Sequence, residues 1–382
     1  MKVLQRYLAA ENVRAVGYVL VAFLALFAFF DLIGELKSVG KGGYGLGLAF
    51  LYVAMGLPGY AYDLMPIAAL IGTIYVLAQM ASTSEFTIMR VSSMSTGMAA
   101  SMLFRIGILF ALLTFVFGEF VAPRASEYAE KLKLGLQGTS VSQQFRSGLW
   151  AKDVIKEDGA NGAPIGTRFL NVREMKLTGE LLGLKIYEFD GDFRMSAVIS
   201  AASATYSGRN TWSLKGVSVT TLPKPGKTQG GAGFDLSAPI AIKTFEQRDL
   251  VSEITPDILA VLFADPDRMS ATDLSAYTKH LTENKQQSER YEIAYWKKLI
   301  YPFAVFVMMA LALPFAYLHA RAGGVSLKIF SGIMLGVSFQ LINSLFSHIG
   351  LLNTWPPLIT AALPSLLFLL IAIVALLWVE RH

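Results

Sequence analysis

The chain of 382 residues contains no cysteine, only four histidines and few charged residues. The absence of cysteine excludes disulfides, thiolate metal sites and cysteine nucleophiles. The histidines are scattered without a ligand spacing such as HExxH, and no grouping of serine, histidine and aspartate stands out. Metal binding and histidine-based catalysis therefore have little support, and the chain is not expected to be an enzyme.

A phosphate-binding loop of the form GxxxxGKS or GxxxxGKT is also missing, so the chain cannot be its own P-loop ATPase. We expect no cofactor in this chain, and any ATP would be used by a partner subunit. Lysine and arginine exceed aspartate and glutamate only by 33 to 28, and no basic run with interleaved aromatic residues is present. Nucleic acid is therefore not an expected partner.

Long hydrophobic stretches are abundant: 54% of the residues are hydrophobic, 16% are charged and the mean hydropathy is +0.49. This composition is typical of a membrane protein. The second stretch is interrupted at GLPG (56–59), Asp63 and Pro66, which predicts one kinked helix with a broken outer end. Six stretches are long enough to cross a hydrocarbon core of about 30 Å, at residues 15–33, 46–77, 96–117, 299–317, 329–346 and 358–379.

Residues 1–14 place apolar and polar side chains on opposite helical faces, which predicts a short helix lying at the cytoplasmic surface. A cleaved signal peptide is the alternative, but no convincing small-x-small site follows the apolar run. An odd number of spans before residues 123–270 then places that segment outside the membrane, in the periplasm of a double-membrane bacterium. Basic residues near the span ends favour this orientation, with both termini cytoplasmic: Lys2, Arg6, Arg14, Arg90, Arg321, Lys328 and Arg381 inside, against Lys37 and Lys41 outside.

The segment 123–270 separates two groups of three spans and has a β pattern. Runs rich in β-branched and aromatic residues predict an all-β sandwich or open barrel, and residues 271–298 predict a helical linker into the fourth span. The fold class expected is therefore an α-helical membrane protein, 3+3, with an inserted all-β periplasmic domain. The runs lie at 168–172, 184–189, 195–206 and 212–222, with turn signals at 157–159, 190–192, 207–210 and 223–226.

The cytoplasmic link between spans two and three, residues 82–92, is the best candidate for a coupling element. Ser84 can cap a short helix, and Glu85 in its first turn is favourable to the helix dipole. Phe86 and Met89 lie three residues apart on one face, and Arg90 follows. Such a helix could fit a groove on an ATPase, or it could be an amphipathic connector on the lipid surface; spacing alone leaves both open.

Several motifs occur in order along the whole chain: ELK (35–37), PIAAL (66–70), SE (84–85), GEFVAP (118–123) and GLWAKD (148–153). Together with three spans, a β domain and three more spans, they resemble the LptF/LptG permeases of lipopolysaccharide export. GLWAKD and the entry into span four, from WKK (296–298) to Pro302, are more similar to the LptG branch.

The resemblance implies a jelly-roll-like β domain open along one edge and a set of partners. These are the paralogous permease LptF, an LptB ATPase dimer, the single-span accessory protein LptC, periplasmic LptA and lipopolysaccharide itself. The resemblance also maps residues 84–90 onto the family's ATPase-coupling helix. The protein would be a non-catalytic inner-membrane permease subunit of an ABC transporter for outer membrane biogenesis.

A carrier of lipopolysaccharide needs an apolar cavity and a cationic rim. Lys37 and Lys41 are head-group candidates, although lysines in outer loops are commonly just solvated. For any single candidate phenylalanine of the cavity, the alternative is that its side chain faces the surrounding lipid. The LptF-type paralogue and a membrane-anchored scaffold that only holds envelope proteins are the alternative functions. The lipid-cavity candidates are Phe23, Phe27, Phe30, Phe330, Phe339 and Phe346.

Overall fold

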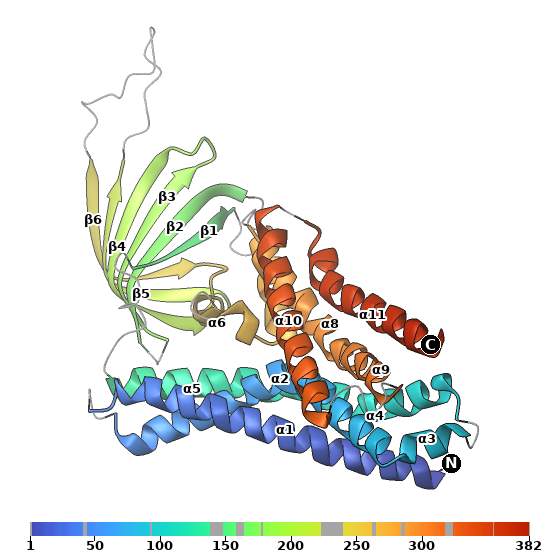
Figure 1. The fold of residues 1–382 in the computed structure, drawn as a ribbon. Coiled ribbons are helices and arrows are strands. Elements are labelled where there is room, and N and C mark those ends of the chain that lie inside the picture. Colours follow the sequence, from blue (N-terminus) through green and yellow to red (C-terminus); the bar gives the residue numbers. More distant parts are fainter. Residues whose placement is uncertain are drawn as a thin grey trace.

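The protein is a helical bundle that carries a curved β-sheet at one end (Figure 1). We call this end of the bundle the sheet end, and the opposite end, where both termini lie, the terminal end. The computed structural model describes residues 2–40, 44–91, 94–137, 148–157, 164–176, 179–222, 240–261, 265–283, 287–317, 324–353 and 355–381.

Six helices among the described residues are long and apolar enough to cross a membrane, which confirms the predicted number and the 3+3 arrangement around the inserted sheet. Two of them are composite: α4 continues through a π-helical turn η1 into α5, and α8 continues into α9. The bounds are α1 (Lys2–Leu36), α2 (Leu46–Ser82), α4 (Thr96–Val116), η1 (Phe117–Val121), α5 (Ala122–Gln137), α8 (Glu289–Ala312), α9 (Pro314–Tyr317), α10 (Val325–Leu352) and α11 (Pro357–Arg381).

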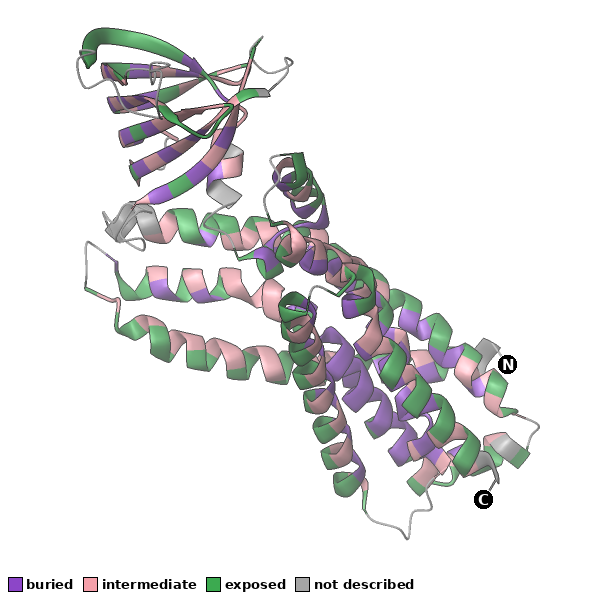
Figure 2. Ribbon diagram, turned by 90° about the horizontal axis from the view of Figure 1, so that it is seen from above, coloured by how far each residue is buried: buried purple, intermediate pink, exposed green. Residues whose placement is uncertain are grey.

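Helix α2 is the centre of the bundle. In its most apolar window 78% of the residues are buried, against 6% in α1. Helices α1, α8 and α10 pack on it. The contacts with α1 and α10 are close because glycines lie there: an added Cβ would lie 2.7 Å from Val16 at Gly72, and 2.8 Å from Ile67 at Gly336. Exposed residues accordingly cover the outer helices (Figure 2).

The expected surface helix at residues 1–14 is not a separate element. Helix α1 runs for 35 residues without a break, from Lys2 to Leu36. Leu8, Asn12 and Val16 follow one another at a spacing of four, and all three are buried, at 7%, 0% and 1% exposure. Because these positions share one helical face, the amino-terminal segment packs into the bundle as a continuation of the first span.

Two predicted span ends also differ from the structure. Helix α2 continues through residues 56–59 with Pro58 and Pro66 inside it, so the predicted break is absent. The third helix does not end at residue 117 but reaches Gln137. Both extensions pack on each other, α5 against α2, and this tertiary contact stabilises helix where the polar and proline-containing sequence predicts an end.

The inserted domain is one antiparallel sheet of six strands in the order β1-β2-β3-β4-β5-β6. It is a single curved sheet and thus matches the open-barrel alternative, and each of the four predicted runs lies essentially within a strand. Residues 190–192 and 207–210 form hairpin turns, whereas the signals at 157–159 and 223–226 lie wholly or mostly outside the described residues. The strands are β1 (Leu149–Lys156), β2 (Pro164–Met175), β3 (Leu181–Asp190), β4 (Met195–Gly208), β5 (Thr211–Thr221) and β6 (Ala241–Val251).

The concave side of the sheet is filled at the sheet's base. Trp212 and Leu259 are almost fully buried there, the latter on the short helix α6 (Pro256–Val261). The Trp212 indole Nε1 donates a hydrogen bond of 2.7 Å to the Ile254 carbonyl. After a 3₁₀ turn η3 (Pro266–Arg268), helix α7 (Ala271–Glu283) packs on α8 and connects the domain to the fourth span.

Candidate functional site

The short helix α3 (Glu85–Val91) lies at the terminal end (Figure 1) and is anchored from the inside. Phe86 is 4% exposed, and its ring meets Tyr317 edge-on at 5.2 Å between centroids. Met89 packs against the same core cluster. The Tyr7 hydroxyl donates a 3.4 Å hydrogen bond to Glu85 Oε2. Helices α1, α2 and α9 therefore hold α3 in place.

The exposed side of α3 differs from the side that its spacing suggested. Ile88 and Val91 are 64% and 82% exposed, whereas Phe86 and Met89 face the bundle. Ser84 is not an N-cap in the usual extended conformation, because its φ is +63°. The two large apolar side chains thus position α3, and smaller ones form its outer surface. The side chain of Arg90 lies outside the described part.

The structure does not bring the six candidate phenylalanines into one cavity. Phe23 and Phe27 are half-buried where α1 meets α2, and Phe27 packs on Tyr60 at 4.9 Å. Phe339 is 1% exposed and packs on Phe368 inside the bundle, so it is a core residue. Phe330 is exposed and Phe346 half-buried on the flanks of the bundle, whereas the exposed Phe30 also lines a pocket at the sheet end. Lys37 is exposed after α1, and Lys41 lies outside the described residues.

A pocket of about 290 Å³ opens at the sheet end, and the sequence reasoning missed it. We call it the sheet-end pocket. Its walls come from α1, α2, α5, η3 and α8, which are distant in sequence. The signal that could have found it is the presence of ionisable residues in membrane segments, which are expensive unless functional or paired. Its charged lining residues are Asp31, Glu35, Asp63, Glu130, Asp267, Arg268 and Lys298.

One wall of the sheet-end pocket is a closed polar group around Glu35. The Lys133 ammonium lies 2.6 Å from Glu35 Oε1 and 4.4 Å from the centroid of the Tyr52 ring. The Tyr44 hydroxyl donates to Glu35 Oε2 at 3.2 Å. Burial, together with the Glu35 carboxylate, raises the pKa of Tyr44 to about 12. Both oxygens of Glu35 are therefore already used inside the protein.

The π-helical turn η1 ties the third span to the base of the sheet domain through Glu119. Its carboxylate accepts hydrogen bonds from the backbone N–H groups of Ala271 and Thr272, at 2.7 and 3.2 Å, and from the Thr272 hydroxyl at 2.7 Å. Ala271 and Thr272 are the first two residues of α7, so Glu119 caps that helix from another part of the chain.

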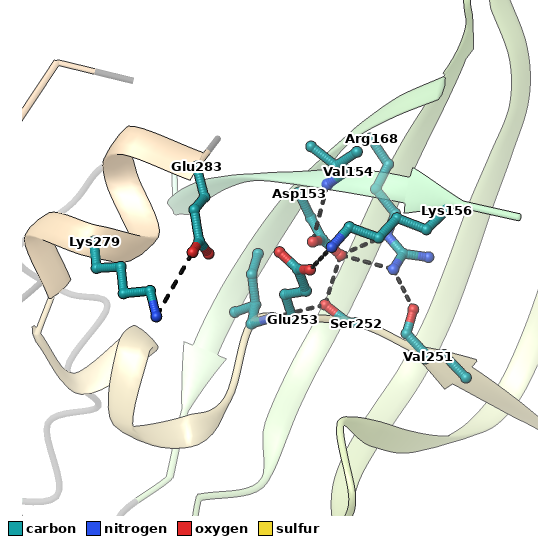
Figure 3. A network of polar contacts seen from close by, with 10 residues as sticks. Asp153, Val154, Lys156, Arg168, Val251, Ser252, Glu253, Lys279 and Glu283 are labelled. Carbon is teal, nitrogen blue, oxygen red and sulfur yellow. Dashed lines mark hydrogen bonds and ion pairs between the residues drawn. The ribbon is translucent and has the colours of Figure 1, made fainter. Parts of the chain in front are cut away.

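A buried polar clasp joins the first strands of the sheet to the segment that follows the last one (Figure 3). Asp153 on β1 is 0% exposed and receives hydrogen bonds of 2.7 Å from Arg168 Nε on β2 and from the Ser252 hydroxyl. The Arg168 guanidinium also donates to the Val251 carbonyl, and Lys156 pairs with Glu253. The clasp therefore holds the curved sheet against its own exit segment.

Within the described residues, no group of three or more His, Asp or Glu side chains could hold a metal ion. The fold is that of a multi-span membrane protein with an inserted sheet domain, built from two groups of three helices. The family model "Lipopolysaccharide export system permease LptF/LptG" matches residues 6–378. The chain belongs to this family.

Individual relatives place the chain within the family. LptG of Escherichia coli K12 is 29% identical over 372 residues, 97% of each chain. LptG of Haemophilus influenzae is 27% identical over 368 residues, 96% of each. LptF of E. coli K12 is 22% identical over 378 residues, covering 98% of this chain and 94% of the relative. The greater similarity to LptG agrees with the interpretation of the motifs.

Proposed function

We propose that this chain is the LptG-type permease subunit of an ATP-driven transporter, which extracts lipopolysaccharide from the inner membrane and passes it to a periplasmic bridge toward the outer membrane. The observation that carries the proposal is the family match, which spans both helix groups and the sheet. LptF would be the paralogous partner, LptB the ATPase, LptC the accessory protein and LptA the receiver. Both termini would be cytoplasmic and the sheet periplasmic.

The cargo determines what the transporter must supply. Each buried CH₂ is worth about 0.8 kcal/mol, so a chain of about 12 carbons would lose roughly 10 kcal/mol on entering water. Lipopolysaccharide must therefore pass between apolar surfaces. The exposed Phe30 on α1 and Phe330 on α10 would contribute to such a surface with the paralogue, and Lys37 would meet head-group phosphates at the sheet end.

ATPase binding would use the outer surface of α3. Ile88 and Val91 form an exposed apolar pair at the terminal end, beside Glu85. Phe86, buried against Tyr317, would transmit motion of α3 to α9 and so to the fourth span. Closure of the ATPase would compress the bundle from this end and drive lipid toward the sheet.

The test is copurification with the ATPase and ATP-dependent release of lipopolysaccharide from proteoliposomes, for the wild type and for Glu85→Lys and Ile88→Asp. We expect both variants to fold but to lose ATP-dependent release, while Thr87→Ser, an exposed position of the same helix, keeps it. A scaffold function would leave both variants unaltered, and copurification with LptG instead of LptF would assign the chain to the other branch.

A further inference from the structure

The sheet-end pocket contains charges that the protein itself does not neutralise by contact. Glu35 is occupied by Lys133, and Asp267 is occupied by Lys297, whose ammonium lies 3.1 Å from Asp267 Oδ1. Five other lining residues make no ion pair with any described residue. They are Asp31, Asp63, Glu130, Arg268 and Lys298.

Lys298 is the most informative of these residues. It is 7% exposed and lines the pocket, and it makes no hydrogen bond with the described residues. Its ammonium lies 4.9 Å from the centroid of the Tyr62 ring, a cation–π contact that only partly replaces a counter-ion. The Lys298 ammonium is not one of the fully buried polar atoms without a partner among the described residues, so it is accessible from the pocket, where an anionic group can reach it.

Asp63 indicates that the ligand also carries a positively charged group. It is exposed although its neighbours Tyr62 and Leu64 on α2 are 8% and 9% exposed. It is accessible because it borders the pocket, where it is joined by Asp31 from α1. The exposed carboxylate of Asp63 and the half-buried one of Asp31 line the pocket together with tyrosine side chains of α2, a setting chemically suited to an ammonium group.

The two kinds of charge come from different walls. The carboxylates of Asp31, Asp63 and Glu130 lie on α1, α2 and α5, whereas Arg268 and Lys298 lie on η3 and α8. A ligand with a single charge would leave one wall without a partner. A dipolar ligand would satisfy both walls, and a volume of about 290 Å³ is at the small end of ligand pockets, which suits a head group rather than a whole lipid.

We propose that the sheet-end pocket binds a group of the phosphoethanolamine type, which carries a phosphate and a primary amine. Lys298 and Arg268 receive the phosphate, and Asp63 and Asp31 receive the ammonium. The group can belong to a lipid at the membrane surface or to a small soluble molecule. The inference does not depend on the proposed transport function, because binding requires neither ATP nor an ATPase.

The experiment uses the full-length protein in nanodiscs of phosphatidylglycerol, alone or doped with phosphatidylethanolamine, without nucleotide. The first readout is carbodiimide labelling of Asp63, followed by mass spectrometry. We expect phosphatidylethanolamine to protect Asp63 in the wild type, and phosphatidylglycerol alone to leave it reactive. Soluble phosphoethanolamine is added in a separate arm: protection there supports the same chemistry and identifies a soluble source.

The second readout is the affinity for phosphatidylethanolamine by native mass spectrometry. Asp63→Asn and Lys298→Gln should each weaken it by about tenfold or more, the change expected from losing about 1.4 kcal/mol. Lys298→Arg should retain most of it. Glu127→Gln and Arg124→Gln, on exposed positions of α5 outside the pocket, should change it by less than about twofold, well under 1.4 kcal/mol.

Two results would overturn the proposal. If phosphatidylglycerol protects Asp63 as well as phosphatidylethanolamine does, the pocket is an anion site and the carboxylates play no part. If neither lipid nor soluble phosphoethanolamine protects Asp63 in the folded wild type, the charges of the pocket balance one another without a ligand. A lack of ATP-dependent lipopolysaccharide release would contradict the proposed function and leave this result untouched.

Discussion

Breaking the Asp153–Arg168 clasp should destabilise the sheet domain far more than breaking an exposed ion pair. The Asp153 side chain is 0% exposed and that of Arg168 is 7% exposed. Arg168→Met removes the guanidinium and leaves a buried carboxylate with one remaining side-chain partner, Ser252. Loss of one member of a buried pair costs about 3–5 kcal/mol.

The matched control is Lys176→Met. Lys176 lies 2.8 Å from Glu180, but the side chains are 47% and 31% exposed. Exposed pairs contribute about 0–1 kcal/mol because water and salt screen them. The double variant Asp153→Leu with Arg168→Met removes both charges, so it should recover most of the lost stability.

Hydrogen exchange of the full-length protein in detergent measures this difference. A loss of about 3–5 kcal/mol should speed exchange of the β1 and β2 amides by roughly a hundredfold to a few thousandfold, at about tenfold per 1.4 kcal/mol. Exchange in α10 and α11 should not change. The reasoning is refuted if Arg168→Met resembles Lys176→Met, or if the double variant is less stable than Arg168→Met.

Three further predictions follow from the same structure. Glu119→Ala removes the cap of α7 and should lower the stability of that helix by about 1–2 kcal/mol. Amide hydrogen exchange should become faster at residues 271–274 and stay unchanged in β3, and unchanged exchange at both would show that the cap contributes nothing. Burial lowers the pKa of His280 below 6.5, so the unfolded chain binds the proton more readily and the domain should lose stability as the pH falls below about 6.5. His280→Gln should flatten this pH dependence of thermal unfolding, and an equally steep profile would exclude His280 as its source. Because the chain has no cysteine, cysteines introduced singly at Thr87 and Ser207 should react with an impermeant maleimide from opposite sides of the membrane, and reaction from one side would overturn the proposed orientation.

Several features could be predicted because short stretches of the sequence are enough to specify them. A helix that crosses a membrane needs a long apolar run whatever its neighbours are, so the six spans could be counted. Strands have period-two patterns and turn residues, and the four predicted runs fall in β2 to β5. β6 was not predicted as a strand, because Ala241 to Asp249 are all exposed and carry no alternating apolar pattern.

The orientation of α3 could not be predicted for a physical reason. Phe86 and Met89 share a face, and large apolar side chains fit a partner's groove as well as the protein's own interior. Only the position of Tyr317, more than two hundred residues later in the chain, shows that the face turns inward. Phe339 was likewise assigned to a cavity, because a single apolar position does not reveal that Phe368 covers it.

The sequence by itself determined the class of protein. The length of the apolar segments, the charges near the span ends, the β insert and the ordered motifs are local properties that can be recognised from the sequence alone. The tertiary structure alone decided which charged residues lie together in one site. Asp63 and Lys298 are separated by more than two hundred residues and look like interruptions of apolar segments, yet they line one pocket. Folding sets which charges meet, because a buried charge is stable only beside the partners that packing brings to it.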